Sequence, residues 1–198
     1  MTKIKLCGLR RECDIEYANE LLPEYIGFVF AKKSKRYVSY EEAKQLKAML
    51  DKRIMAVGVF VNEDIERITR LVQEGVIDIV QLHGREDEAY ICRLRETVDC
   101  PIIQAFRIKD SQDIEVVRAS GADYVLLDSG GGSGECFDWS LIEGLDRPYF
   151  LAGGLTFENV QEAIRRLQPF AVDVSSALET DGYKDKTKME QFVDVVRR

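Results

Sequence analysis

Short apolar runs alternate with charged segments of helical period along the whole chain, and this repeat limits the folds that the sequence can adopt. We expect each apolar run to form a β-strand and each charged segment to form an α-helix. The predicted strands are Ile4–Cys7, Ile26–Phe30, Met55–Val61, Ile77–Leu82, Ile102–Phe106, Tyr124–Asp128, Tyr149–Ala152 and Ala171–Val174. The predicted helices cover residues 13–22, 40–50, 63–74, 86–97, 111–120, 139–144, 157–167 and 186–197, and the sixth has the weakest pattern.

Eight strand–helix units can close into a barrel. Many of the runs are continuously apolar and rich in Val and Ile, as expected for strands whose two faces are both buried in a parallel sheet. A chain of 198 residues leaves about 25 residues for each unit, so the loops must be short. We therefore predict an α/β fold, a compact (β/α)8 TIM barrel, with residues 1–198 forming one domain. A doubly wound open sheet is the structural alternative.

The charge distribution limits the partners that the protein can have. The chain has 28 Lys and Arg against 35 Asp and Glu, a net charge of -7, whereas a nucleic-acid surface needs clustered cations. A locally positive pocket for a small anion is still compatible with an acidic protein. No signal-peptide pattern is present, and no run approaches the ~18 apolar residues of a membrane span. We expect a cytoplasmic protein without nucleic-acid or membrane partners, acting as a monomer or a homodimer.

The five cysteines are widely scattered, and none of them forms a CxxC pair or lies near the single histidine, His83. This pattern argues against a structural zinc site and against a disulfide framework.

Polar residues end several of the predicted strands. In a parallel barrel the residues that carry chemistry lie where strands end and the following loops begin. The residues expected at this rim are Cys7-Gly8 after the first strand, Gln81-Leu82-His83-Gly84 after the fourth, Asp128-Ser129 after the sixth, Gly153-Gly154 after the seventh and Ser175-Ser176 after the eighth.

Three segments near the last strands are suited to a phosphate group. They are Gly130-Gly131-Gly132-Ser133-Gly134, Ala152-Gly153-Gly154-Leu155 and Asp173-Val174-Ser175-Ser176-Ala177-Leu178-Glu179. Glycines let backbone N–H groups approach an anion closely, and barrels often bind phosphate after strands seven and eight. The alternative is that these segments are ordinary tight turns. From them we take Gly132, Gly134, Gly153, Gly154, Asp173, Ser175 and Ser176 as candidate substrate-binding residues.

Asp128 ends the apolar run Tyr124–Leu127, so its carboxyl group is expected at the barrel mouth with limited solvation. Partial desolvation raises the pKa of a carboxyl group and suits it to general-acid catalysis. The alternative is a helix cap or a salt-bridge partner.

Cys7 is the candidate base, although an unpaired cysteine is often only a small buried apolar residue. A thiolate would need stabilisation by peptide N–H groups or by a cation. Strand alternation puts Cys7 and Lys5 on one face, with Ile4 and Leu6 on the other. The apolar face should meet the helices, which leaves Cys7 pointing into the barrel.

Two other positions are candidates for the lining of the pocket. Arg36, next to Lys35 in the loop after the second strand, can hold a carboxylate through two hydrogen bonds, or it can simply be solvated. Gln81 and His83 should share an inward face, although a lone histidine often makes only a structural hydrogen bond.

Taken together, these segments resemble the phosphoribosylanthranilate isomerase family of tryptophan biosynthesis. The resemblance extends over the whole chain in order, through Lys5-Leu6-Cys7-Gly8-Leu9, Gly27-Phe28-Val29-Phe30, Ser34-Lys35-Arg36-Tyr37-Val38, Val57-Gly58-Val59-Phe60, Val80-Gln81-Leu82-His83-Gly84, Leu127-Asp128-Ser129, Gly131-Gly132-Ser133-Gly134, Phe137-Asp138-Trp139, Leu151-Ala152-Gly153-Gly154-Leu155 and Asp173-Val174-Ser175-Ser176. Each piece alone is weak, but their joint order and spacing are specific.

The resemblance implies a barrel that catalyses the Amadori rearrangement of N-(5-phosphoribosyl)anthranilate without a cofactor or a metal. It assigns the role of general acid to Asp128 and the role of general base to Cys7. Arg36 would bind the anthranilate carboxylate, and the last three glycine and serine loops would bind the phosphate.

Two departures from the family pattern are visible. Lys35 stands where the family commonly has Pro, and Ala177 lies where Gly is common, so the phosphate turn must tolerate a Cβ atom. A histidine-pathway isomerase, which runs the same chemistry with a pair of aspartates, is one alternative. A non-catalytic phospholigand-binding barrel is the other, and it would need neither Cys7 nor Asp128.

Overall fold

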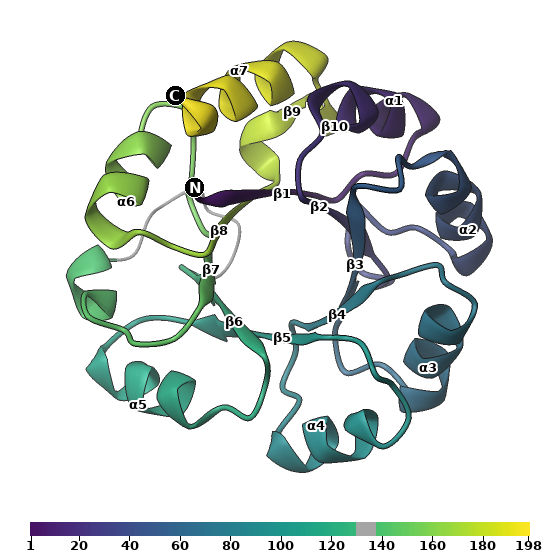
Figure 1. Cartoon of the computed structure of the whole chain (residues 1–198). Helices are drawn as coiled ribbons and strands as arrows, with labels where there is room; N and C mark the ends of the chain where they lie inside the picture. Colours follow the sequence, from purple (N-terminus) through teal and green to yellow (C-terminus); the bar gives the residue numbers. More distant parts are fainter. Residues whose placement is uncertain (130–137) are drawn as a thin grey trace.

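The protein is a closed barrel of eight parallel strands surrounded by helices, which confirms the predicted fold class. The computed structural model describes residues 1–129 and 138–198. Figure 1 looks along the barrel axis and shows the strands as an inner ring with the helices outside it. The strands of the ring are β1 (Lys3–Cys7), β2 (Tyr25–Val29), β3 (Met55–Phe60), β4 (Ile79–Leu82), β5 (Ile102–Arg107), β6 (Tyr124–Asp128), β7 (Tyr149–Leu151) and β8 (Ala171–Val174).

The helices follow the strands in the predicted order. They are α1 (Glu12–Leu21), α2 (Tyr40–Met49), α3 (Ile65–Gln73), α4 (Glu88–Arg95), α5 (Ser111–Ala119), α6 (Val160–Leu167) and α7 (Lys186–Arg197), together with the 3-10 helices η1 (Trp139–Ile142) and η2 (Ser176–Leu178). The weak sixth helical pattern forms η1, a single short 3-10 segment, in place of an α-helix over 139–144. In the described residues, no helix is long and apolar enough to cross a membrane.

Acidic side chains set where several helices begin. Asp64, Asp87, Asp110 and Asp185 each accept a hydrogen bond from a backbone N–H in the first turn of α3, α4, α5 and α7. The predicted helices 63–74 and 86–97 therefore start too early, because Asp64 and Asp87 are caps that stand outside the helix.

One strand and one helix begin later in the structure than predicted. In both cases a side-chain hydrogen bond, which a pattern of apolar residues does not reveal, precedes the observed start. The predicted strand Ile77–Leu82 loses its first two residues, since the Asp78 carboxylate accepts the Ala56 N–H at 2.7 Å. The predicted helix 157–167 begins only at Val160, because Asn159 accepts the Thr156 N–H at 2.9 Å in a preceding turn.

A small hairpin after the barrel was not predicted. Strands β9 (Glu179–Thr180) and β10 (Tyr183–Lys184) pair antiparallel around Asp181-Gly182. Both turn residues have positive φ, of 53° and 79°. An Asp-Gly pair favours this kind of two-residue turn, so the sequence did contain the signal.

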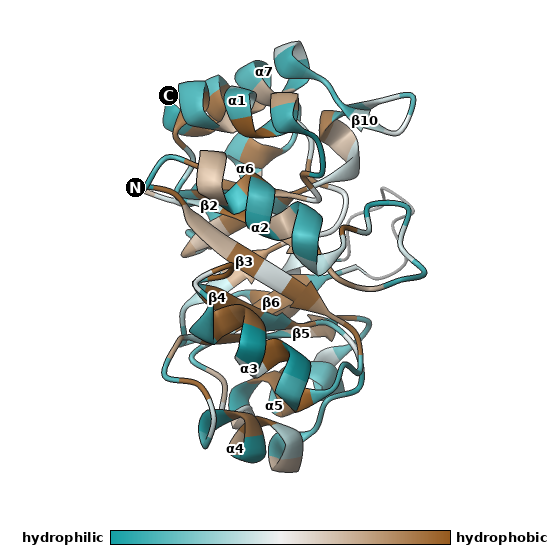
Figure 2. Cartoon of the chain, turned by 90° about the vertical axis from the view of Figure 1, so that its right-hand side faces the viewer, coloured by the Kyte–Doolittle hydropathy of each residue, from teal (hydrophilic) through white to brown (hydrophobic). Residues whose placement is uncertain are grey.

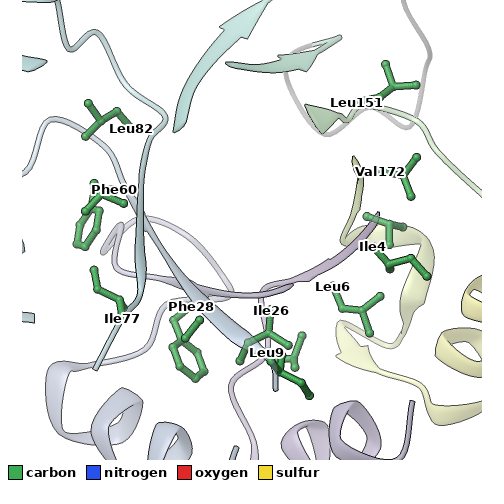
Figure 3. Packing of buried hydrophobic residues seen from close by; sticks show 14 of the residues in the cluster. Ile4, Leu6, Leu9, Ile26, Phe28, Phe60, Ile77, Leu82, Leu151 and Val172 are labelled. Carbon is green, nitrogen blue, oxygen red and sulfur yellow. The ribbon is translucent and has the colours of Figure 1, made fainter. Parts of the chain in front are cut away.

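Strand alternation divides the apolar residues into two layers. Ile4 and Leu6 belong to the large cluster between strands and helices, as expected. Figure 3 shows such side chains, among them Leu6 and Phe28, outside the ring of strands, and Figure 2 shows hydrophobic residues concentrated in the strands and on the helix surfaces that meet them. The opposite faces of the strands fill the barrel interior.

The interior itself changes character along the barrel axis. Its amino-terminal end is filled by an apolar cluster that includes Tyr25, Leu126 and Phe150, with the Tyr25 and Phe150 rings 5.4 Å apart between centroids. Nearer the carboxyl ends of the strands, Cys7 packs against Val29 and Val59. Because the amino-terminal end is plugged, any pocket must open at the carboxyl-terminal rim.

We expect Phe150→Ala to lower the free energy of unfolding by about 3–5 kcal/mol, because it empties part of the interior cluster. Urea unfolding measures this loss. Val116→Ala, at an exposed helix position, is the matched control and should change stability by less than about 0.5 kcal/mol. Equal small losses in both variants would show that the interior cluster does not support the barrel.

Candidate functional site

A pocket of about 490 Å³ opens at the carboxyl-terminal rim of the barrel. Every predicted site residue that the structure describes lines this pocket. These residues are Cys7, Arg36, Gln81, His83, Asp128, Gly153, Gly154, Asp173, Ser175 and Ser176. Gly132 and Gly134 were also predicted, and they lie outside the described residues.

Cys7 lies at the end of β1 with its side chain inside the barrel, and it is buried. Burial raises the pKa of the Cys7 thiol, and the carboxylate of Asp173 raises it further. The ammonium groups of Lys5 and Lys184 oppose this rise because they favour the thiolate. Of the two kinds of stabilising group expected from the sequence, peptide N–H groups or a cation, the structure places two cations near this sulfur.

Lys5 lies two residues before Cys7 on the same inward face of β1. Its side chain is fully buried, and its Nζ atom is 2.9 Å from Asp173 Oδ1 on β8. Burial disfavours the charged ammonium, but the negative partners Asp173 and Cys7 outweigh it and raise the pKa of Lys5. Asp173 thus lines the pocket while one of its oxygens is occupied by Lys5.

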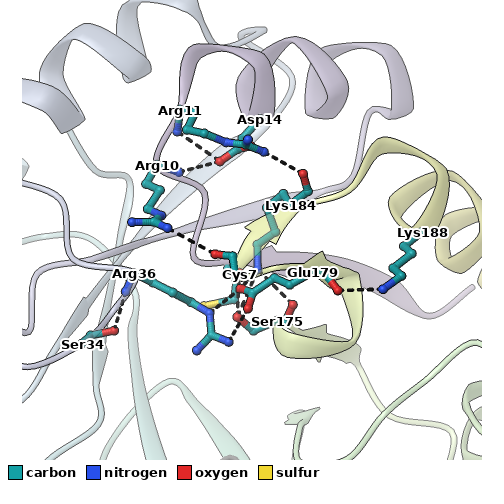
Figure 4. Close-up of polar contacts among 11 residues, drawn as sticks. Cys7, Arg10, Arg11, Asp14, Ser34, Arg36, Ser175, Glu179, Lys184 and Lys188 are labelled. Carbon is teal, nitrogen blue, oxygen red and sulfur yellow. Dashed lines mark hydrogen bonds and ion pairs between the residues drawn. The ribbon is translucent and has the colours of Figure 1, made fainter.

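Arg36 is held at the pocket edge by Glu179, the first residue of β9. Its Nε and Nη2 atoms donate to the two Glu179 oxygens at 2.5 and 2.8 Å (Figure 4). Lys184 Nζ on β10 contacts the same carboxylate at 2.8 Å. Although burial of Glu179 opposes it, these hydrogen bonds lower the pKa of the carboxyl group to about 2. The Glu179 hydrogen bonds likewise raise the pKa of Arg36.

Ser175 connects this cluster to the strand that carries Cys7. Its Oγ donates to the Cys7 carbonyl oxygen at 2.9 Å, and its own carbonyl accepts from Lys184 Nζ at 2.9 Å. The side chain of Lys184 is 1% exposed, and its burial lowers the pKa of the ammonium in spite of Glu179. Through Lys184 and Ser175, the β9–β10 hairpin is hydrogen-bonded to the place where β1 and β8 meet.

Asp128 ends β6, two strands away from β8 in the ring, so it reaches the pocket from a different side than Cys7. Its side chain is partly buried, and His83 Nε2 lies 3.7 Å from Asp128 Oδ2. Gln81 Nε2 lies 2.9 Å from His83 Nδ1. As predicted, Gln81 and His83 share the inward side. They form a chain of contacts in which Gln81 touches His83 and His83 lies next to the Asp128 carboxyl group.

Two glycines permit close approaches at this rim. Gly153 has a φ of 80°, and a Cβ atom there would lie 2.5 Å from the Ser129 nitrogen and 2.7 Å from Asp128 Oδ1. Gly8 has a φ of 82°, and a Cβ atom there would overlap the Arg36 side chain. The Ala177 departure causes no backbone strain, since Ala177 lies in η2 and is not among the residues with positive φ.

Sequence reasoning did not assign roles to Lys5, Lys184 or the side chain of Glu179. Lys5 could have been found, because it shares the inward face of β1 with Cys7. The contact between Arg36 and Glu179 spans 143 positions and depends on the small hairpin, which leaves no local signal. In the described part of the chain, no three His, Cys, Asp or Glu side chains are grouped as ligands for a metal ion.

Comparisons with known proteins agree on one family. The family model of N-(5'phosphoribosyl)anthranilate (PRA) isomerase matches residues 4–195. An N-(5'-phosphoribosyl)anthranilate isomerase of Thermoanaerobacter sp. (strain X514) is 47% identical over 204 residues, covering 100% of this chain and 98% of the relative.

Solved structures give the same result. The phosphoribosyl anthranilate isomerase of Thermotoga maritima has a TM-score of 0.92 and 36% identity, with 100% of this chain and 99% of the other covered. A phosphoribosyl anthranilate isomerase in complex with reduced 1-(o-carboxyphenylamino)-1-deoxyribulose 5-phosphate has a TM-score of 0.90 and 35% identity, with the same coverage.

We expect Gly153→Ala to destabilise the protein more than Gly75→Ala, measured by urea unfolding. Both glycines have positive φ, which costs about 1–2 kcal/mol with a side chain. Gly75 has open space around it, whereas the new methyl group at Gly153 meets Ser129 and Asp128 and adds about 1–3 kcal/mol of overpacking. Equal losses would show that Gly153 is not needed for the close approach to Asp128.

Proposed function

The chain belongs to the N-(5'-phosphoribosyl)anthranilate isomerase family, and we propose that Asp128 and Cys7 perform the first two proton transfers of the reaction that defines it. The protein is an isomerase of tryptophan biosynthesis, which converts N-(5'-phosphoribosyl)anthranilate to 1-(2-carboxyphenylamino)-1-deoxyribulose 5-phosphate by an Amadori rearrangement. The observation that carries the proposal is that Cys7, Asp128, Arg36 and the glycine turn Gly153-Gly154 line one pocket.

Asp128 acts first, as the general acid. Its carboxyl group gives a proton to the furanose ring oxygen, the bond between C1 and that oxygen breaks, and the nitrogen lone pair forms the C=N bond of a protonated Schiff base. The place of Asp128 at the pocket wall supports this role, because a general acid must lie within reach of the atom that it protonates. His83, next to Asp128 Oδ2, orients the carboxyl group.

Cys7 acts second, as the general base. The thiolate takes the proton from C2 of the sugar, the C–H electron pair forms the C1=C2 bond, and the C=N electrons return to nitrogen. The resulting enolamine then loses its hydroxyl proton and gains a proton at C1, which gives the ketone product. Over the whole sequence the substrate gains and loses two protons each, so no external oxidant or reductant is needed.

Arg36 binds the anthranilate carboxylate in this proposal. Glu179 occupies the Nε–H group and one Nη2–H group, but a guanidinium has five N–H donors. The Nη1 group and the second Nη2–H group can therefore hold a second carboxylate through two hydrogen bonds. Glu179 is thus an anchor that fixes the plane of the guanidinium.

The phosphate group is placed at the turns after β7 and β8. Backbone N–H groups of Gly153, Gly154 and the Ser175-Ser176 turn can donate to its oxygens, and Gly132 and Gly134 are further candidates. The sugar hydroxyl groups have separate candidates. Gln81 Oε1 is buried without a hydrogen-bond partner among the described residues, and Asp173 has an oxygen that Lys5 does not occupy.

The partner of this site is a small phosphoribosyl compound. We propose that the protein acts as a monomer or a homodimer. We place the reaction in the cytoplasm, since the phosphorylated substrate is too polar to cross a membrane unaided.

We expect the purified protein to convert phosphoribosylanthranilate without added metal, followed as the loss of anthranilate-type fluorescence. Cys7→Ser and Asp128→Asn should each lower kcat by roughly 100-fold to 10,000-fold with little change in substrate affinity, because each group acts in a transition state. A folded wild-type protein that binds the substrate without turning it over would contradict the enzymatic role, and near-normal turnover of Cys7→Ser would place the base elsewhere.

Variants of the Arg36 cluster should instead change KM. Arg36→Met is expected to raise KM by roughly 10-fold to 100-fold, the effect of about 1.5–3 kcal/mol in charge-assisted hydrogen bonds. Glu179→Gln should raise it less, since the cation remains but its plane is no longer fixed. Lys33→Met removes an exposed cation of the same loop and is the control. An unchanged KM in Arg36→Met would remove the carboxylate role.

A further inference from the structure

Lys5 is a charged side chain in a place where charges are rarely found, the closed interior of a barrel. Its exposed fraction is 0%, and it lies between the apolar cluster at the amino-terminal end and the pocket at the other end. Lys5 is not among the residues that line the pocket. The proton transfers described above do not use it.

The strand geometry fixes the position of Lys5 relative to Cys7. Side chains two residues apart on a strand lie on the same face, so Lys5 stands directly beneath Cys7, and its ammonium interacts electrostatically with the sulfur. The register of β1 with β8 pairs Lys5 with Asp173, whose Oδ1 atom is 2.9 Å from the ammonium. The Asp173 carboxylate therefore holds Lys5 in place, while Lys5 faces Cys7, whose thiol becomes an anion when it loses its proton.

Several other charged groups face the sulfur and must be counted with Lys5. Lys184 on β10 and Arg36 in the loop after β2 both interact electrostatically with Cys7, and both contact Glu179. With Lys5 and Asp173 the group holds three cations and two carboxylates. Its net charge is therefore +1 while Cys7 is a thiol, and it becomes neutral when Cys7 is a thiolate.

We propose that Lys5 is a positioning residue that stabilises the thiolate of Cys7 when it forms and keeps the sulfur aimed into the pocket, and that Asp173 fixes Lys5 in place. This inference rests on the assignment of Cys7 as the base. A buried sulfur ionises with difficulty because it has lost its water, and a fixed ammonium replaces that water as the group that stabilises the negative charge. Among the cations around Cys7, Lys5 is the one on the same strand and the same inward face, and it is fully buried.

The two members of the Lys5–Asp173 pair have opposite effects on Cys7. Removing the ammonium of Lys5 should make the thiolate harder to form. Removing the charge of Asp173 should make it easier, because the carboxylate repels the thiolate and because the thiolate then becomes the anionic partner of Lys5. A purely structural pair would shift ionisation in neither direction.

The test measures ionisation of Cys7 in the free enzyme, independently of turnover. Wild type, Lys5→Met, Asp173→Asn and the double variant are treated with iodoacetamide over a range of pH, and alkylation is followed by mass spectrometry of the peptide that carries Cys7. The midpoint of reactivity should rise by about one to three pH units in Lys5→Met and should fall in Asp173→Asn. The double variant, which has no unpaired buried charge, should lie between wild type and Lys5→Met.

The acid limb of the kcat/KM profile should move in the same order, since it reports the ionisation of the free enzyme. Lys3→Met is the matched control, because Lys3 is also on the inward face of β1 but contacts Tyr25 and Phe170 at the far end of the barrel. Its midpoint should equal that of wild type.

An alkylation midpoint that stays at the wild-type value in Lys5→Met would overturn the inference. If Lys5→Met does not fold, the other two variants provide the test. The inference is then overturned if the alkylation midpoint of Asp173→Asn or of the double variant does not move in the stated direction. The alkylation result separates this inference from the proposed function. A shifted midpoint in a protein whose Cys7→Ser variant remains active would uphold the pairing of Lys5 with Cys7 and reject Cys7 as the base.

Discussion

Hydrogen bonding between β1 and β8 closes the barrel, and the arrangement of the site depends on this closure. The register pairs Lys5 with Asp173, so the first and last strands are joined by a buried ion pair as well as by their backbones. Ser175 adds a hydrogen bond to the Cys7 carbonyl just above that pair. Cys7 thus occupies the junction where the two ends of the chain meet, and its surroundings exist only when the barrel is complete.

The same closure lets one pocket hold two groups of opposite character. Asp128 is partly buried at the end of β6 beside His83, whereas Cys7 lies deeper and is surrounded by Lys5, Lys184 and Arg36. The cations around Cys7 oppose the rise in pKa that burial causes and stabilise the thiolate, which supports its proposed role as the proton acceptor. The position of Asp128 at the pocket wall supports its proposed role as the proton donor.

The sequence predicted what depends on periodicity and order, and it could not predict what depends on distant segments meeting. Alternation along β1 placed Cys7 inside the barrel and Ile4 outside it, and strand order placed Asp128 on the same rim. The contact of Arg36 with Glu179 depends on the closed ring and on the β9–β10 hairpin, so no local sequence pattern predicts it. The start of β4 depended on the Asp78 carboxylate, which accepts the Ala56 N–H, and a pattern of apolar residues does not reveal such a contact.

A crystal structure of this protein with the reduced product analogue, the compound that a relative has been solved with, would test the assignment of the two groups most directly. We expect C2 of the sugar chain to contact the Cys7 sulfur, the hydroxyl group derived from the ring oxygen to contact Asp128, and the carboxylate to lie on Arg36. An analogue bound with C2 turned away from Cys7, next to a different titratable side chain, would contradict the proposed roles.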